Sequence, residues 1–243
     1  MVSVYLCATS AACMAQEFMS VQIGHFEGLG ETTEVVRKLV RSTYLKGVVG
    51  FESLDDVGRI NVNIANADFG AALRAICSED RRYRTVTTGS AHVVNILAAE
   101  PFGRGREILD FQIPKLDIEI DEWPENLITR LADYSPTLWS FLREVYLRNG
   151  GVYVDPPGAG AVFYGNAKRP HFSIHLVKAS VRDALNVIAA QSFEIYRTIG
   201  VDPGLVATPD QLRVAPTGWE LRFFEPRDMA FYAWLYRIFR VLR

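Results

Sequence analysis

Two stretches of the chain carry nearly the same pattern: residues 60–76 read INVNIANADFGAALRAI, and residues 172–188 read FSIHLVKASVRDALNVI. In the first stretch, apolar residues alternate with polar or small ones, and this period of two predicts a strand with one buried face. Asp68 then stands at a helix N-cap position, and an apolar stripe with helical spacing follows it. The alternating residues are Ile60, Val62 and Ile64, and the stripe consists of Phe69, Ala72, Leu73 and Ile76.

The second stretch repeats each of these features. Ser180 stands at the cap position, between an alternating apolar segment and a second helical stripe. The alternating residues are Phe172, Ile174 and Leu176, and the stripe consists of Val181, Ala184, Leu185 and Ile188. Because the cap and the stripe recur at the same spacing, we predict that the chain contains two copies of one strand–helix unit.

The segments that precede each copy also match one another. Residues 32–44 have an amphipathic pattern that predicts a helix, and the apolar residues 47–52 predict a strand after it. Before the second copy, residues 127–146 have a helical pattern that is broken near Pro136, and residues 151–154 predict a strand. We therefore expect each half to begin with a helix and a strand.

The segments that follow each copy are expected to be strands. Residues 81–86 and 92–97 predict a hairpin that turns at residues 88–90. The tripeptide Tyr-Arg-Thr occurs at residues 83–85 and again at residues 196–198, which favours a matching hairpin in the second half.

Two further strands and a linker complete the predicted organisation. Residues 116–120 predict an extra strand before the second helix, and residues 219–224 predict the strand that closes the second half. Residues 98–106 contain Pro, Gly and two Arg, a composition typical of a linker between the halves.

At this point each half resembles the STN domain, the secretin and TonB short N-terminal domain. The residues that carry the resemblance are the strand, the capped helix with Ala-Leu-x-x-Ile, and the following hairpin that contains Tyr. It covers residues 23–98 and, less regularly, residues 107–225. The resemblance implies an α+β fold of two tandem small domains, each with two helices packed against small β-sheets. In that family the domain docks onto partner proteins in the periplasm and catalyses nothing.

The resemblance does not extend to the barrel or pore regions of that family, so transport and channel activity are not expected here. What it implies is a folded adaptor that offers sheet edges and loops to a partner.

The first 15 residues contain no charged side chain and end in Cys-Met-Ala, which predicts a signal peptide over residues 1–15, with Gln16 as the first mature residue. The alternative is a buried apolar strand. Cleavage would remove Cys7 and Cys13 and leave Cys77, which cannot form an internal disulfide alone. Export without disulfides favours a bacterial periplasm, so we expect an exported cell-envelope protein. Cys77 itself is expected to be a packed, unreactive thiol.

Composition excludes several function classes. The formal net charge is −2, with 26 basic and 28 acidic residues, so the chain lacks the basic balance of a nucleic-acid binder. The longest apolar run is too short to cross a bilayer. Neither a glycine-rich phosphate motif nor a nucleophile elbow is present. We therefore expect no catalytic residue, no cofactor-binding residue and no metal ligand, and the enzyme hypothesis has the least support.

Histidines and carboxylates lie on two predicted strands. His171 and His175 alternate out of phase with the apolar residues of the second copy, so they are expected on an exposed polar face. Their separation along a strand, about 13 Å, is too long for two ligands of one metal. Asp117, Glu119 and Asp121 share one side of the extra strand. A solvated face or an acidic surface for a basic partner is favoured there over a calcium site.

Two segments remain as candidate interaction sites. Residues 199–218 form a long connection whose apolar residues are expected to pack on the domain or to bind a partner. These residues are Leu205, Val206, Leu212 and Val214. Residues 226–243 predict an aromatic and basic C-terminal helix that lies on an anionic membrane, docks in the groove of a partner, or packs on its own domain. The residues that define it are Phe231, Trp234, Leu235, Arg237, Arg240 and Arg243.

Together these patterns predict a non-enzymatic, exported protein of the bacterial envelope that serves as an adaptor or docking module. Its expected partner is another envelope protein, bound by strand addition at an exposed sheet edge. The alternative is a peripheral protein that its C-terminal helix holds on a membrane surface.

Overall fold

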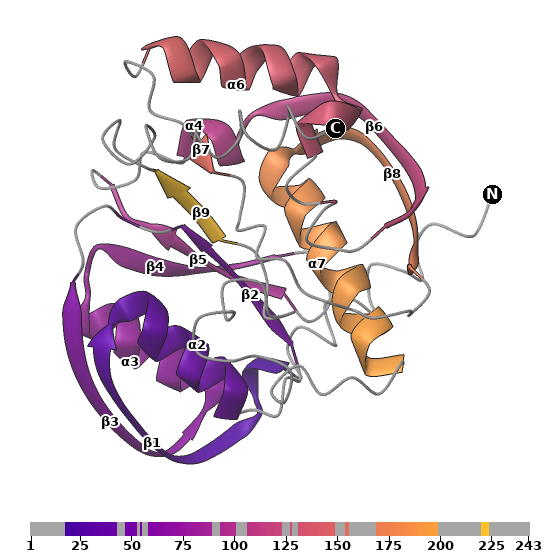
Figure 1. The fold of residues 1–243 in the computed structure, drawn as a ribbon. Coiled ribbons are helices and arrows are strands. Elements are labelled where there is room, and N and C mark those ends of the chain that lie inside the picture. The colour runs from indigo at the N-terminus through magenta and orange to yellow at the C-terminus, as the bar shows by residue number, and fades with distance from the viewer. Residues whose placement is uncertain are drawn as a thin grey trace, which may run out of the picture.

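Each half of the chain folds into the same order of elements: strand, helix, strand, strand, helix (Figure 1). The computed structural model describes residues 18–42, 47–52, 54, 58–88, 93–100, 106–122, 127, 131–148, 154–155, 169–198 and 220–223. The first half contains β1 (Gln22–Glu31), α2 (Thr32–Ser42), β2 (Val48–Glu52), β3 (Arg59–Asp68) and α3 (Phe69–Glu79), followed by the hairpin of β4 (Tyr83–Thr87) and β5 (Val93–Ala98). The second contains the short α4 (Arg106–Leu109), then β6 (Gln112–Asp121), the 3₁₀ turn η1 (Leu131–Tyr134), α6 (Pro136–Arg148), β7 (Val154–Asp155), β8 (His171–Ser180), α7 (Val181–Thr198) and β9 (Glu220–Phe223).

In each half, two long strands form a separate antiparallel ribbon. β1 pairs with β3, and β6 pairs with β8. The two ribbons start at the same place, because Gln22 lies opposite Asp68 and Gln112 lies opposite Ser180. In each ribbon, therefore, the first residue of the first strand pairs with the residue that caps the following helix.

The backbone hydrogen bonds around the ribbons recur as well. The amide of Phe69 donates to the carbonyl of Val21 at 2.8 Å, and the amide of Val181 donates to the carbonyl of Phe111 at 3.0 Å. At the other end of each ribbon the amides of Thr32 and Glu122 likewise donate to the residues that precede β3 and β8; the acceptors are Gly58 and Pro170. Such agreement in local bonding indicates one structural unit that occurs twice.

The predicted caps are confirmed. Asp68 accepts from the amide of Ala71 at 2.6 Å, and Ser180 accepts from the amide of Asp183 at 3.1 Å. Asp183 in turn accepts from the amide of Ser180, which completes a reciprocal capping box. The predicted stripes are also confirmed, since all eight residues are at most 5% exposed: Phe69, Ala72, Leu73, Ile76, Val181, Ala184, Leu185 and Ile188.

A central five-stranded sheet lies between the two cores, in the order β4-β5-β2-β9-β7. Its strands come from both halves, and β2 runs parallel to β5 and to β9. Every side chain of β5 is buried, and successive side chains point to opposite faces. Val94 and Ile96 join the core of the first half, whereas Val93 and Leu97 join the core of the second. The fold is thus a mixed, α+β arrangement of helices and small sheets (Figure 1). One strand, β5, contributes side chains to both cores.

Two sequence predictions about the strands were wrong. The strand around residues 116–120 is not an extra element, because β6 has a counterpart in β1, which was not predicted. The reason is glycine: β1 reads QIGHFEGLGE, and its inward positions after Phe26 are Gly28 and Gly30, so no apolar alternation is visible. A Cβ atom at Gly28 would lie 2.5 Å from Val35 of α2, which explains why the strand has no side chain there.

The recurrence of Tyr-Arg-Thr was also misleading. Residues 83–85 lie on β4, but residues 196–198 form the last turn of α7, so the two tripeptides are not equivalent. The break predicted near Pro136 is the start of a helix, since Pro136 is the first residue of α6, a position that suits a residue without an N–H. The predicted closing strand at residues 219–224 is present as β9, which lies between β2 and β7 in the central sheet.

Candidate functional site

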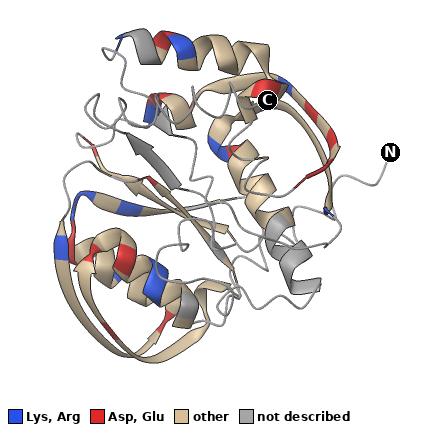
Figure 2. Cartoon of the chain, viewed as in Figure 1, with Lys and Arg blue, Asp and Glu red and all other residues tan. Residues whose placement is uncertain are grey.

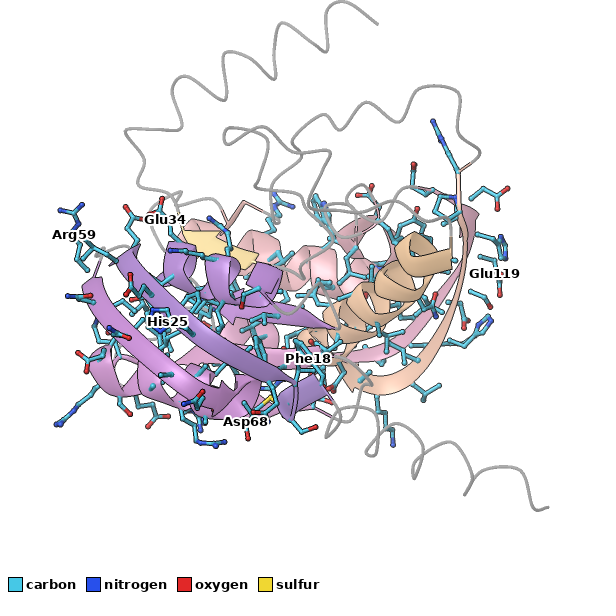
Figure 3. The ribbon with its side chains drawn as sticks, turned by 90° about the horizontal axis from the view of Figure 1, so that it is seen from below. Phe18, His25, Glu34, Arg59, Asp68 and Glu119 are labelled. Atoms are coloured by element: carbon cyan, nitrogen blue, oxygen red, sulfur yellow. The ribbon has the colours of Figure 1, made fainter. Side chains whose placement is uncertain are left out.

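The outer face of the second ribbon gathers three carboxylates, two imidazoles and a hydroxyl. Cross-strand register brings them together: Asp117 lies opposite His175, Glu119 opposite Ser173, and Asp121 opposite His171. We call these six residues the acid–histidine ladder. Figure 3 shows Glu119 on the outer side of the ribbon, away from α7, and Figure 2 shows acidic residues along β6.

Strand alternation positions the ladder. The residues between its members point inward and are buried in the second core, where Ile118, Phe172 and Ile174 are at most 1% exposed. The titratable side chains of the ladder are instead between 46% and 61% exposed. The sequence prediction that both histidines and all three carboxylates lie on exposed strand faces is confirmed.

The carboxylate of Glu119 is the centre of a continuous hydrogen-bond network. Its Oε1 accepts from Ser173 Oγ at 2.6 Å and contacts His175 Nε2 at 2.8 Å, and its Oε2 contacts His171 Nε2 at 3.0 Å. The second nitrogen of each ring faces another carboxylate. His171 Nδ1 lies 2.8 Å from Asp121 Oδ1, and His175 Nδ1 lies 3.2 Å from Asp117 Oδ1.

These contacts shift the protonation of the ladder. Hydrogen bonds with Asp121 and Glu119 raise the pKa of His171 above its usual value, and bonds with Asp117 and Glu119 do the same for His175. The pKa of Asp117 is lowered by its hydrogen bonds, first with Lys115 and then with His175. Ser173 is the largest cause of the lowered pKa of Glu119. The site therefore favours imidazolium beside carboxylate.

The first ribbon has an equivalent backbone pairing, but different side chains line its outer face. Glu27 lies opposite Asn63, Leu29 opposite Asn61, and Glu31 opposite Arg59. Leu29 stands at the place that corresponds to Glu119, and it is 79% exposed.

The structure gives no support to a calcium site at the ladder. Across the parts of the chain that the structure describes, no group of three or more His, Cys, Asp or Glu side chains is arranged to hold a metal ion. Cys77 on α3 is half-buried, and desolvation, followed by the charge of Asp80, raises its pKa to about 11. The thiol is therefore protonated at neutral pH, as expected for a packed, unreactive cysteine.

The other predicted site residues lie outside the described residues. These are Leu205, Val206, Leu212 and Val214 of the long connection, and Phe231, Trp234, Leu235, Arg237, Arg240 and Arg243 of the C-terminal segment. The predicted signal peptide, residues 1–15, also lies outside them.

In the sequence the acids and the histidines lie on two separate predicted strands, and no pattern points to Ser173. The Gln-Ile dipeptide at residues 22–23 and 112–113 marks β1 and β6 as counterparts, but the pairing of β6 with β8 is visible only in the structure.

Among the helices that the structure describes, none is both long and apolar enough to cross a membrane. Comparisons with protein-family models, with curated proteins and with solved structures found no match.

Proposed function

We propose that this protein is a non-enzymatic docking module of the bacterial cell envelope, with two tandem STN-like units. The observation that carries the proposal is that two ribbons with the same register present different outer faces. The two ribbons share a backbone conformation but differ in their solvent-exposed side chains. This is expected of a scaffold whose surfaces bind partners.

The ribbons supply the type of edge that partner strands use. Because each is a two-stranded sheet within the described residues, every one of its strands has an edge that pairs with no described strand. Such edges can accept an additional strand through main-chain hydrogen bonds, while neighbouring side chains provide specificity. Leu29 and Val177 are 79% and 71% exposed on the two ribbons, which adds apolar surface beside these edges.

A crosslinking experiment tests the proposal. The full chain, with an affinity tag, is crosslinked in cells and recovered from the envelope fraction, and its partners are identified by mass spectrometry. We expect a stoichiometric protein partner. Leu29→Asp and Val177→Asp place the same charge on the two ribbons, so each variant serves as the control for the other. Loss of the partner in one variant alone would identify the docking ribbon, and recovery of no partner by the wild-type chain would refute the proposal.

The proposed location has its own test. Fusion to a reporter that is active only after export should give activity in the envelope, and a version without residues 1–15 should remain inactive. Equal reporter activity in the two fusions would contradict export through that segment.

A further inference from the structure

The acid–histidine ladder is not needed to build its ribbon. The first ribbon folds in the same register with Glu27, Leu29 and Glu31 opposite Asn63, Asn61 and Arg59. Ion pairs between exposed side chains contribute little to stability, with a median near zero to about 1 kcal/mol. Six interacting polar side chains at one exposed place therefore call for an explanation other than folding.

The hydrogen bonds of the ladder depend on the protonation of its histidines. Both nitrogens of His171 contact carboxylate oxygens, and so do both nitrogens of His175. A neutral imidazole can donate from one nitrogen only, whereas imidazolium donates from both. When the histidines lose their protons, one contact on each ring places a nitrogen lone pair against a carboxylate oxygen. Those carboxylate oxygens are then available to another donor.

The charge of the surface changes with the same protons. When both histidines are protonated, three carboxylates face three cations, the third being Lys115 beside Asp117. When both are neutral, the carboxylates exceed the cations. The neighbouring charges do not compensate for this change: Arg169 pairs with Glu122, Arg182 pairs with Asp110, and α7 packs on the apolar side of the ribbon.

The spacing of the carboxylates specifies a kind of partner. Asp117, Glu119 and Asp121 occupy alternate positions of β6, so they recur about every 6.7 Å along the strand. An extended peptide with basic residues at alternate positions has the same repeat. Opposite charges that face each other between neighbouring strands attract, and like charges repel.

We propose that the acid–histidine ladder binds an extended, basic segment of a partner protein, with Lys or Arg at alternate positions, and that protonation of His171 and His175 releases it. This inference rests on the docking function proposed above and names the chemistry of its partner. The surface binds the basic segment when its imidazoles are neutral. When they are charged, they occupy the carboxylates themselves.

The test uses the full chain and a labelled peptide in which the dipeptide Lys-Thr is repeated four times. The charge-reversed control is the same peptide with Glu in place of Lys. Binding is measured by fluorescence anisotropy at low ionic strength, at about pH 8 and about pH 5.5, on either side of the histidine range. We expect the basic peptide to bind about tenfold or more tightly at the higher pH. The Glu-Thr peptide should bind at neither pH.

Three double variants locate the effect. Asp117→Asn with Asp121→Asn should abolish binding, whereas Glu27→Gln with Glu31→Gln removes the corresponding charges from the first ribbon and should leave it unchanged. His171→Asn with His175→Asn should bind equally well at both pH values, because the two groups assigned to the switch are then absent. Absence of peptide binding, equal binding by the wild-type chain at both pH values, or equal weakening by the two acid variants would each overturn the inference.

Failure of this inference is distinguishable from failure of the docking function. If the crosslinked partner is recovered by the Asp117→Asn, Asp121→Asn variant at the wild-type level, the docking function stands and the ladder is not its binding surface. If the wild-type chain recovers no partner, the docking function fails whatever the peptide does.

Discussion

Asn66 and Lys178 occupy the same place in the two ribbons, and both adopt a left-handed backbone, with φ of 55° and 51°. Each lies two residues before the helix cap, Asp68 or Ser180. Among the described residues other than glycine, these two alone have a positive φ. A shared conformation that costs energy is stronger evidence for a repeated unit than shared apolar residues, because many unrelated folds use the same apolar spacing.

The left-handed position gives a first prediction. Lysine tolerates this conformation less well than asparagine, and a β-branched residue tolerates it least. Lys178→Gly should therefore raise the free energy of unfolding by up to about 1 kcal/mol, and Lys178→Val should lower it by about 1–2 kcal/mol. Urea denaturation measures both. Asn66→Gly is the control and should gain less, since Asn already suits the site; the opposite order of gains would contradict the assignment.

The strand that serves two cores predicts cooperative unfolding. Leu73→Ala and Leu185→Ala each remove a buried side chain, one from each core, and each should cost about 2–5 kcal/mol. Because β5 packs on both cores, we expect scanning calorimetry to show a single transition that moves down in both variants. Arg74→Ala, which faces solvent, should change stability by less than about 0.5 kcal/mol. Two resolved transitions, each sensitive to one leucine, would mean that the halves unfold independently.

Asn95 on β5 predicts a stabilising substitution. Its side chain is fully buried, and neither its Oδ1 nor its Nδ2 has a hydrogen-bond partner among the described residues. An unsatisfied buried polar group costs about 1–3 kcal/mol, and valine suits a central strand. Asn95→Val should therefore raise the melting temperature. A lower melting temperature would indicate that the amide has a polar partner elsewhere in the chain, and Asn95→Asp should be strongly destabilising in either case.

Asp80, at the end of α3, predicts a loss of stability in acid. Burial opposes its charge, but hydrogen bonds from Arg82 and Thr32 outweigh this, so its pKa lies below the usual value. Thr32 Oγ1 donates to Oδ2 at 2.7 Å, and Arg82 Nε donates to Oδ1 at 2.8 Å. A lowered pKa in the folded state means that the stabilisation is present above the pKa of the unfolded chain and is lost as the pH falls through the folded value.

Asp80→Asn should accordingly cost about 2 kcal/mol at neutral pH and progressively less in acid. The measurement is the free energy of unfolding of both proteins from about pH 7 to about pH 3. Thr32→Val is a matched partial variant that removes one hydrogen bond and keeps the charge. A difference between wild type and Asp80→Asn that stays constant over this range would contradict the assigned pKa shift.

The raised pKa of Cys77 predicts a slow thiol. With a pKa of about 11, the thiolate fraction is very small at neutral pH. Alkylation by iodoacetamide in the folded protein should therefore be slower than in the urea-unfolded chain by about a hundredfold or more, given an ordinary thiol pKa of about 8.5. Mass spectrometry of a time course measures both rates. Equal rates would mean that the helix opens readily around this residue.

The sequence predicted the parts of the fold in which apolar side chains mark the buried face. The stripes that begin at Phe69 and Val181, and the caps at Asp68 and Ser180, were read correctly because each depends on local spacing. β1 was missed because Gly28 fills an inward position where Val35 leaves no room for a side chain. The position of β9, between β2 and β7, depends on pairing across the whole chain, which no local pattern encodes.

The candidate site was predicted in pieces. Alternation alone placed His171 with His175 on one strand and Asp117 with Asp121 on another. Their meeting depends on the register of β6 against β8, and a slip of one residue would have turned one set toward the core. Register is a long-range property, so the network around Glu119 could be recognised only once the two strands were paired.

The inner side chains of β5 bear on how such a protein can arise. Val93 and Leu97 are covered by the second core, so a single unit on its own would leave both in water. A protein with a single unit would need another molecule to cover this apolar surface. Fusion of two units in one polypeptide supplies the cover at a fixed, high effective concentration, so that assembly no longer depends on how much protein the cell makes.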